Sequence, residues 1–494
     1  MRGRAIRSPP GSAELGRKMR LRTPSEPLER RQQNGRIGIL FYLFSGALIL
    51  GVLYLGVPIS QARLEDRRHR DIFLIAIAAL GIGVGLTAGW SKVWARENRI
   101  MNGAAIALPL YALFQIVPLP LGLVALLSPA RAELVRALTP LSGNHAFASL
   151  SIVPAVTFTH FFLLISYCII FFSIREFALR ARDRVWVMAV PVVLAAAIEA
   201  ALGVAQFFSG GDVVAHGTFD IRNHFAGLLE MALPFPALYM VQAIGKAPPR
   251  GYTDASSTVR ICVGGALTAL LLCGVLCSLS RGGLASILAS TLVTATFFVF
   301  RRKVPLASRL ATAGLFGVVA AAGLFYVTPL PMTARLSEHT SAGRITLWEQ
   351  AIGVVGRYPV VGCGLGGFES AFLRFKMGWG LLIGDYAHND YLQLLAELGM
   401  VGFAIGAVLL GGVSIRVMRR AAEASETRWL ALGCVASLTA IAVHSFVDFN
   451  LYVACNAAVL AWICGLSASL GASMEPAADR VIDARLVHNR ARYA

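Results

Sequence analysis

Apolar runs recur along the whole chain and are separated by short polar stretches, many of them rich in arginine. A helix of about 20 apolar residues is long enough to cross the hydrocarbon core of a bilayer. The pattern therefore predicts about twelve membrane-spanning helices. They lie near residues 37–57, 72–90, 103–127, 154–174, 185–208, 224–244, 260–279, 284–300, 310–328, 391–414, 429–447 and 451–471.

Five prolines fall inside or beside these runs. We interpret them as kinks rather than helix ends, because neighbouring membrane helices can satisfy the backbone groups that a proline frees. They are Pro118, Pro120, Pro191, Pro234 and Pro236.

Composition agrees with this pattern, since 56% of the residues are hydrophobic and only 15% are charged. These values exclude an ordinary soluble globular protein and predict an all-α integral membrane protein. The net charge of +18 does not indicate nucleic-acid binding, because Lys and Arg fall in short clusters between apolar runs rather than on one basic face.

The basic clusters predict the orientation of the chain in a membrane of the inner-membrane type, because cytoplasmic loops carry an excess of Lys and Arg. Three clusters and both tails fall on one face, which we take as cytoplasmic. The cluster at 63–70 is an exception, because it falls on the opposite face. The three clusters are Arg175, Arg180, Arg182 and Arg184; Arg301, Arg302, Lys303 and Arg309; and Arg416, Arg419, Arg420 and Arg428.

The pattern of apolar runs and basic clusters divides the chain into four segments. We predict a disordered basic cytoplasmic tail, N-terminal transmembrane helices, a membrane catalytic region and a cytoplasmic C-terminal tail. The catalytic region includes one large extracytoplasmic loop, 329–390, which we expect to carry short helices lying on the membrane surface. In order, the four segments are 1–36, 37–150, 151–471 and 472–494.

Two arginines on the predicted outer face are candidates for binding an anion. Arg281 lies between two apolar runs with Ser280 and two glycines, where an arginine is costly unless it reaches the interface or binds an anion. Arg344 begins a stretch whose apolar positions recur at helical spacing, although spacing alone also fits an ordinary surface arginine. The glycines of "VVGCGLGGF" (360–368) lack a following lysine and favour a flexible turn over a phosphate loop.

His388 precedes a long apolar run and is the candidate general base. Asn389 and Asp390 are the residue types that cap helices, so the imidazole would lie in the first turn, beside the positive end of the helix dipole. That field favours a neutral imidazole, which can accept a proton. The alternative is that His388 only belongs to a helix cap.

The order of four motifs resembles the conserved domain of the O-antigen ligase family, which includes O-antigen and exopolysaccharide polymerases. They are "SRGG", "GRITLWEQA", "PVVGCGLGGF" and "AHNDYLQLLAELGMVGF". "GTFDIRNHFAG" (217–227) and "VHSFVDFNLY" (443–452) are similar to the elements that flank this domain, so the resemblance covers roughly residues 150–470.

The resemblance implies a metal-independent, inverting membrane glycosyltransferase without a cofactor. It implies an undecaprenyl-diphosphate-linked glycan as donor, and an acceptor hydroxyl on lipid A-core or on a growing glycan, at the periplasmic face. It assigns diphosphate binding to Arg281 and Arg344, and activation of the acceptor to His388. The secondary candidates for the site are Asn389, Asp390, Arg222, Asn223 and Asp448.

The sequence alone leaves several alternatives open. Ligation and polymerisation use the same chemistry and differ only in the acceptor. About twelve helices with carboxyls inside the membrane, at Glu199 and Glu230, also fit a transporter of polysaccharide or lipid-linked sugar. His444 and Asp448 lie four residues apart and could either support the site or only pair with each other. The eight cysteines are interpreted as packing residues.

Overall fold

The computed structural model describes residues 28–55, 81, 99–210, 214–246, 255–299, 314, 341–375, 385–423 and 425–470. Helices make up most of this part of the chain, and its two short strands form one antiparallel pair. The prediction of an all-α architecture is therefore confirmed. Two predicted helices, 72–90 and 310–328, lie outside the described residues apart from single positions, as do the arginine cluster at 63–70 and the C-terminal tail.

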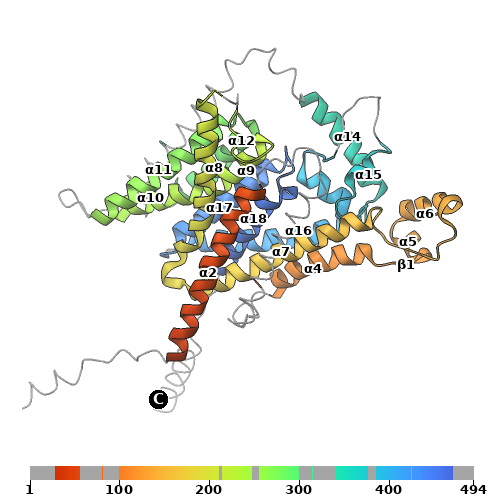
Figure 1. Ribbon diagram of the computed structural model, residues 1–494, viewed down its shortest axis with the longest axis horizontal. Coiled ribbons are helices and arrows are strands. Elements are labelled where there is room, and N and C mark those ends of the chain that lie inside the picture. The colour runs from red at the N-terminus through yellow and green to blue at the C-terminus, as the bar shows by residue number, and fades with distance from the viewer. Residues whose placement is uncertain are drawn as a thin grey trace, which may run out of the picture.

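The elements follow one another as in Figure 1. In chain order they are α2 (Leu28–Leu55), α4 (Arg99–Ile116), β1 (Leu119–Pro120), α5 (Leu121–Leu127), α6 (Pro129–Ser142), β2 (Phe147–Ala148), α7 (Pro154–Arg180), η2 (Arg182–Ala189), α8 (Val190–Phe208), α9 (Arg222–Ala232), α10 (Pro234–Lys246), α11 (Ala255–Cys277), α12 (Arg281–Val299), α14 (Ser341–Arg357), α15 (Phe368–Phe372), α16 (Asp390–Ala422), α17 (Arg428–His444), η3 (Asn450–Tyr452) and α18 (Ala454–Leu470).

Six helical segments within the described residues are long and apolar enough to cross a membrane, which is consistent with a multi-pass membrane protein. They are Arg99–Ile116, Pro154–Arg180, Arg184–Phe208, Arg222–Gly245, Ala255–Cys277 and Asp390–Ala422. Three shorter apolar helices, Gly38–Leu53, Arg428–His444 and Ala454–Leu470, coincide with further predicted spans.

One predicted span was wrong. The run 103–127 is not one helix, because α4 ends at Ile116 and the chain then enters β1 and α5. Pro118 and Pro120 explain the break, since neither residue has a backbone N–H to continue a helix. Helix α2 begins at Leu28, inside the segment predicted as a tail, and the rest of that segment lies outside the described residues.

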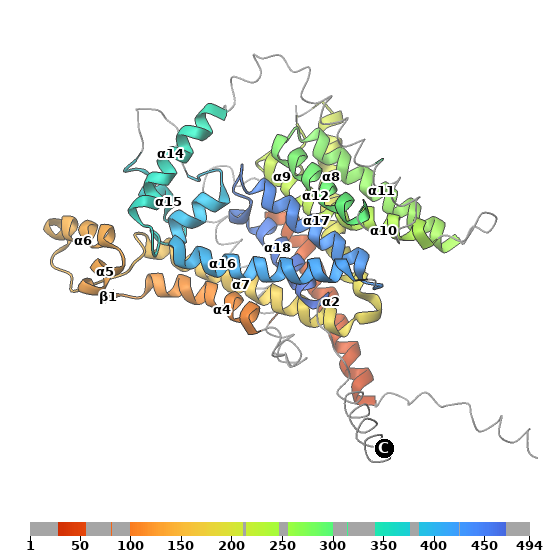
Figure 2. The same cartoon turned by 180° about the vertical axis from the view of Figure 1, so that it is seen from behind.

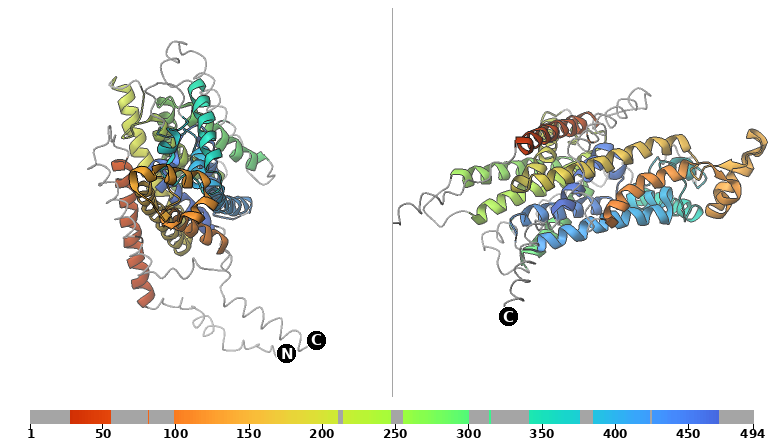
Figure 3. Two further views of the ribbon diagram at one scale, coloured as in Figure 1. Left: turned by 90° about the vertical axis from the view of Figure 1, so that its right-hand side faces the viewer. Right: turned by 90° about the horizontal axis from the view of Figure 1, so that it is seen from below.

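The helices form a bundle whose core lies where α2, α7, α8 and α18 meet. Trp462 of α18 is fully buried, and its ring stacks on Phe44 of α2 at 5.6 Å between centroids. Its indole N–H donates to the carbonyl of Met188, which leads into α8. Seen from below in Figure 3, α4, α7 and α16 run lengthwise side by side, and α5 and α6 lie beyond one end.

Helices α14 and α15 occupy part of the predicted outer loop and lie beside the start of α16, as the view from behind in Figure 2 shows. The glycine-rich turn between them, residues 358–367, packs against a break in α16. That break is at Gly399, which has a φ of 62° and a non-helical conformation. The turn donates the N–H of Cys363 to the carbonyl of Ala396 and accepts the N–H of Met400 at Pro359.

This turn satisfies the backbone groups that the break leaves without helical partners. A side chain at Gly362 would meet the carbonyl oxygen of Glu397 at 2.1 Å, so the close approach requires glycine there. Gln115 of α4 adds a bond from its amide nitrogen to the same carbonyl at 2.9 Å. The prediction of a turn is confirmed, but its contacts make it a closely packed turn rather than a flexible one.

Candidate active site

Three helix ends and one connecting segment meet next to the start of α16. They are the first turn of α9, the first turn of α12, the last turn of α17 and the short connection from α17 to η3. Helix α14 approaches the same place, because the indole N–H of Trp348 donates to the carbonyl of Ala387 at 3.0 Å. The motifs that lie far apart in the sequence therefore converge on His388.

His388 lies just before α16 rather than in its first turn. Asn389 is the N-cap, and its side-chain oxygen accepts the backbone N–H groups of Tyr391 and Leu392. The expected cap at Asn389 is thus present. His388 itself has a φ of 47°, in the left-handed region that a non-glycine residue rarely adopts. Its side chain is 34% exposed, so the imidazole can meet a ligand from outside.

Asp448 lies at the centre of three histidines. Its Oδ1 is 3.5 Å from Nδ1 of His388 and 3.5 Å from Nε2 of His224. Its Oδ2 is 3.9 Å from Nε2 of His444. The side chain of Asp448 is 1% exposed, whereas His388 reaches the outside. The carboxylate can therefore orient the exposed imidazole from behind and stabilise its protonated form.

The charge of Asp448 follows from these neighbours. Burial raises the pKa of this carboxyl, but the imidazoles of His224 and His388 and the charge of His444 lower it more, and the pKa ends well below its ordinary value. Asp448 is consequently ionised at neutral pH. Its Oδ1 also accepts the backbone N–H of Phe449 at 2.9 Å, which fixes the direction of the carboxylate.

An aromatic frame holds the two imidazoles that share Oδ1 of Asp448. The ring of Phe449 meets His224 and His388 edge to face, with centroids 4.6 Å and 4.8 Å away. Tyr386 stacks on Phe449 at 4.2 Å with an interplanar angle of 7°. These contacts restrict the rotation of both imidazoles about their side-chain bonds.

Glu230 extends the cluster into the bundle. Its two carboxyl oxygens lie 3.1 and 3.0 Å from Nδ1 of His444, and both side chains are almost fully buried. His444 thus has a carboxyl group on each side, Glu230 and Asp448. The pairing of His444 with Asp448 that the sequence left open is part of this larger arrangement. Glu230 has a polar partner and is not an isolated carboxyl in the membrane.

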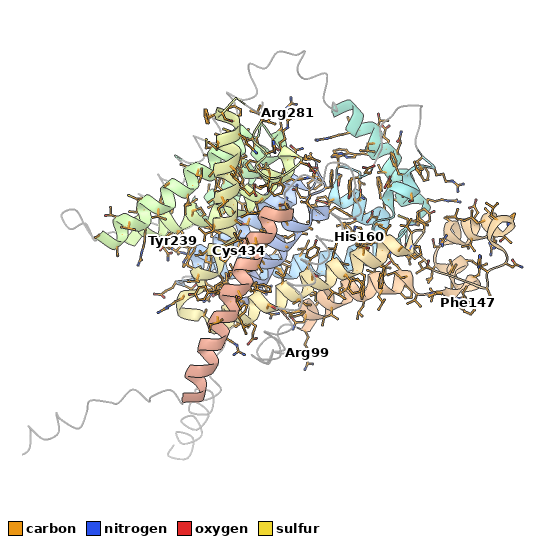
Figure 4. All side chains as sticks on the ribbon, viewed as in Figure 1. Arg99, Phe147, His160, Tyr239, Arg281 and Cys434 are labelled. Atoms are coloured by element: carbon orange, nitrogen blue, oxygen red, sulfur yellow. The ribbon has the colours of Figure 1, made fainter. Side chains whose placement is uncertain are left out.

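The two candidate arginines lie at the starts of the helices that border this cluster. Arg281 is the first residue of α12, it is exposed, and Figure 4 shows it on the upper side of the molecule between α12 and α14. Arg344 is half-buried in the first turns of α14. Within the described part of the chain, no carboxylate lies at ion-pair distance from either guanidinium. That these two cations bind an anion stays a prediction.

The α12 start is joined to the histidines through Gly282. A Cβ at this position would lie 2.7 Å from Nε2 of His444 and 3.0 Å from the side chain of Val447. Ser280 caps the helix, because its hydroxyl accepts the N–H of Gly283 at 3.1 Å. Arg281 therefore extends from a helix start that rests directly on the Asp448 cluster.

Asp390 does not cap its own helix, which corrects the expectation from the sequence. Its carboxyl is fully buried and accepts the hydroxyl of Ser445 at 2.8 Å and the N–H of Leu451 at 3.3 Å. Its backbone N–H donates to the carbonyls of Ser445 and Asp448. Asp390 thus attaches α16 to the connection that carries Asp448.

Residues 266–407 match the family model described as O-antigen ligase. This segment is therefore similar to the O-antigen ligase family, and the resemblance seen in the sequence is confirmed over these residues. No curated protein matches the chain at a significant level. The match includes Arg281, Arg344 and His388, whereas His224, His444 and Asp448 lie on either side of it.

The geometry shows what the sequence-based prediction missed. Arg222 and Asn223 were the candidates from α9, and both are half-buried, but it is the next residue, His224, that contacts Asp448. A single histidine in an apolar helix more often belongs to a core, so its sequence context offers little reason to select it. Its position in "RNHFAG", directly after two selected polar residues, was the available signal.

Glu199 has a structural role that the sequence left open. Its carboxyl accepts both the backbone N–H of Thr218 at 2.9 Å and the Thr218 hydroxyl at 2.7 Å. Gln206, also on α8, donates to the carbonyl of Gly217 at 2.7 Å. Together they hold the loop that leads into α9 and so position His224.

Cys363 lies between Gly362 and Gly364. It is fully buried in the glycine-rich turn, and burial raises the pKa of its thiol well above the usual value, with a further contribution from Glu397. The thiol therefore stays protonated and is a poor nucleophile. All eight cysteines are free thiols. Five of the eight are buried, as packing residues would be, whereas Cys168 and Cys273 are partly buried and Cys262 is exposed.

Proposed function

We propose that this protein is a membrane glycosyltransferase of the ligase or polymerase type. It transfers a glycan from undecaprenyl diphosphate to an acceptor hydroxyl at the periplasmic face of the bacterial inner membrane. The observation that carries the proposal is the contact of the exposed His388 with the buried carboxylate of Asp448, beside two arginines that pair with no carboxylate in the described chain. The O-antigen ligase match supports the same class of reaction.

In the proposed reaction, His388 removes the proton from the acceptor hydroxyl while its oxygen bonds to the anomeric carbon of the donor. The bond from that carbon to the diphosphate oxygen breaks on the opposite face, which inverts the configuration. The lipid diphosphate leaves with the electron pair. Asp448 stabilises the imidazolium that forms, and the proton later passes from His388 to solvent.

Arg281 and Arg344 bind the diphosphate and stabilise the charge that develops on it. A diphosphate is already a good leaving group, so no strong general acid is needed. Guanidinium groups present several N–H donors in a planar fork, which suits phosphate oxygens. With these two cations at the donor, the proposal requires no metal ion.

The decisive experiment separates binding from rate. The protein is reconstituted in nanodiscs with EDTA present, and donor affinity and transfer rate are measured for Arg281→Ala, Arg344→Ala and His388→Ala. Each arginine variant should bind the donor more weakly by about 1.5–3 kcal/mol, the value of a charge-assisted contact. His388→Ala should bind the donor normally and transfer it roughly 10²- to 10⁴-fold more slowly.

Arg357→Ala is the matched control for charge, because Arg357 lies on the same helix as Arg344 but already pairs with Glu133. It should bind the donor normally. Wild-type transfer by His388→Ala, or activity that requires Mg²⁺ or Mn²⁺, would contradict the proposed chemistry.

The acceptor is determined in the same assay. Lipid A-core and short glycan repeats are supplied separately, and the labelled product identifies a ligase or a polymerase. Movement of the lipid-linked glycan across the bilayer without transfer to either acceptor would support the alternative of a transporter instead.

A further inference from the structure

The peptide before His388 is held by side chains from two different helices. Trp348 of α14 donates its indole N–H to the carbonyl of Ala387 at 3.0 Å. Gln393 of α16 accepts the N–H of the same residue at 2.6 Å through its side-chain oxygen. Ala387 is fully buried, so both of its backbone groups depend on these partners.

The side chain of Gln393 is itself held by a further hydrogen bond. Its amide nitrogen donates to Glu397 at 2.9 Å, and the carboxyl of Glu397 also accepts the hydroxyl of Tyr452 at 2.6 Å. The partner on α16 is thus part of a rigid buried network. The partner on α14 is half-exposed and belongs to the helix that carries Arg344.

His388 needs such support because of its backbone conformation. A non-glycine residue at a φ of 47° is strained, and such strain persists only where the surroundings hold it. The strained conformation directs the imidazole toward Asp448, 3.5 Å away. Releasing the preceding carbonyl would let the residue relax toward an ordinary conformation and move the ring away from the carboxylate.

We propose that Trp348 is a positioning residue for the transfer reaction, an inference that rests on the proposed function. Its N–H holds the carbonyl of Ala387 and thereby keeps the imidazole of His388 against Asp448. Arg344 lies one helical turn earlier on the same face of α14. The helix that binds the donor diphosphate therefore also sets the position of the base.

The test removes the indole N–H and keeps an apolar ring. Trp348→Phe should lower the rate constant for transfer roughly ten- to a hundredfold, because a displaced base loses its alignment with the acceptor. Donor affinity should stay within about twofold, since Arg344 remains and neutral hydrogen bonds contribute little to anion binding. Both quantities are measured in nanodiscs with the purified lipid-linked donor.

Trp462→Phe is the matched control. Trp462 also donates its indole N–H to a backbone carbonyl, that of Met188 at 2.8 Å, but it lies in the bundle core. This variant should retain the wild-type transfer rate per folded molecule. An equal loss in both variants would make the Trp348 contact merely structural and overturn the inference.

A double variant tests whether Trp348 acts through His388. When His388 is already alanine, adding Trp348→Phe should cost nothing further in rate. An additive loss, or a loss that resides wholly in donor affinity, would overturn the positioning role. If Trp348→Phe does not fold, 3-benzothienylalanine at position 348 removes the N–H while keeping the bicyclic shape.

The outcomes also separate this inference from the proposed function. Wild-type transfer by His388→Ala contradicts the function itself. A slow His388→Ala variant together with a wild-type rate in Trp348→Phe contradicts only the role of Trp348.

Discussion

Two groups of buried charged side chains lie at opposite ends of the bundle. At one end, Glu230, His444 and Asp448 form a chain that reaches His388 at the outside. At the other end, Arg175 in α7 is fully buried and donates to the side chain of Asn102 at 2.5 Å. The two groups differ in whether their chain of contacts reaches the surface of the protein.

The second group is closed. Glu176 is fully buried and pairs with Arg180 at 2.5 Å, so the charges at this end are bound within the protein. The first group is open, because it ends at a 34% exposed imidazole and has unpaired arginines of the described chain beside it. Burial of charge alone therefore does not identify a site. An open end beside cations that pair with no described carboxylate is what makes the first group a candidate site.

The largest expected effect is at the open group. Asp448→Asn keeps the shape of the side chain but removes the charge that faces the imidazoles. We expect the transfer rate to fall roughly 10²-fold or more, because the imidazolium of His388 loses its stabilising carboxylate. Donor affinity should be unchanged. The measurement is single-turnover transfer in nanodiscs, with Glu423→Gln, an exposed carboxyl that pairs with Arg420, as the control.

The acid stability of the same variant gives an independent check. The pKa of Asp448 is depressed in the folded protein, so its contribution to stability is present above the unfolded value of about 4 and is lost as the pH falls through the lower folded value. The stability difference between the wild type and Asp448→Asn should shrink only below about pH 4. A difference that vanishes already near pH 6 would mean that another group controls it.

An intermediate effect is expected at the closed group, on stability rather than on rate. Glu176→Gln leaves Arg175 buried without its nearest carboxylate. We expect a loss on the order of 2–4 kcal/mol, because an uncompensated buried charge is costly and Arg180 at 17% exposure moderates it. Thermal unfolding in detergent measures the loss. The transfer rate per folded molecule should be that of the wild type, and a lower rate would remove the distinction between the two groups.

The sequence predicted those helices well whose pattern lies within one continuous segment of the chain. Helices α7, α8 and α16 follow from uninterrupted apolar runs, and Asn389 at the start of α16 is the residue type expected of a cap. The break at Gly399 was missed, because its backbone groups are satisfied by a turn about 40 residues earlier in the chain, and no local pattern records that contact.

The sequence predicted only part of the candidate site, because some of its contacts join distant segments of the chain. Arg281, Arg344 and His388 belong to recognisable motifs, and Asp448 was a secondary candidate. The contact of Glu230 with His444 joins residues 214 positions apart, and His224 reaches Asp448 from still another helix. These pairings depend on how the helix ends meet in space, which the spacing within one segment does not contain.

The smallest expected effect concerns the packing between α12 and the open group. In Gly282→Ala, the new methyl would lie 2.7 Å from Nε2 of His444, so the imidazole or the helix start must shift by several tenths of an ångström. The shift acts on Asp448 only through His444 and moves Arg281 slightly. We therefore expect a loss of only about tenfold in transfer rate, shared between donor affinity and turnover.

Gly406→Ala is the matched control, because Gly406 is a glycine of α16 with nothing within 4 Å of the added methyl. It should leave the rate unchanged and stabilise the helix by up to about 1 kcal/mol. If Gly282→Ala transfers as fast as Gly406→Ala, the start of α12 does not act on the histidine cluster, and Arg281 is not coupled to the open group.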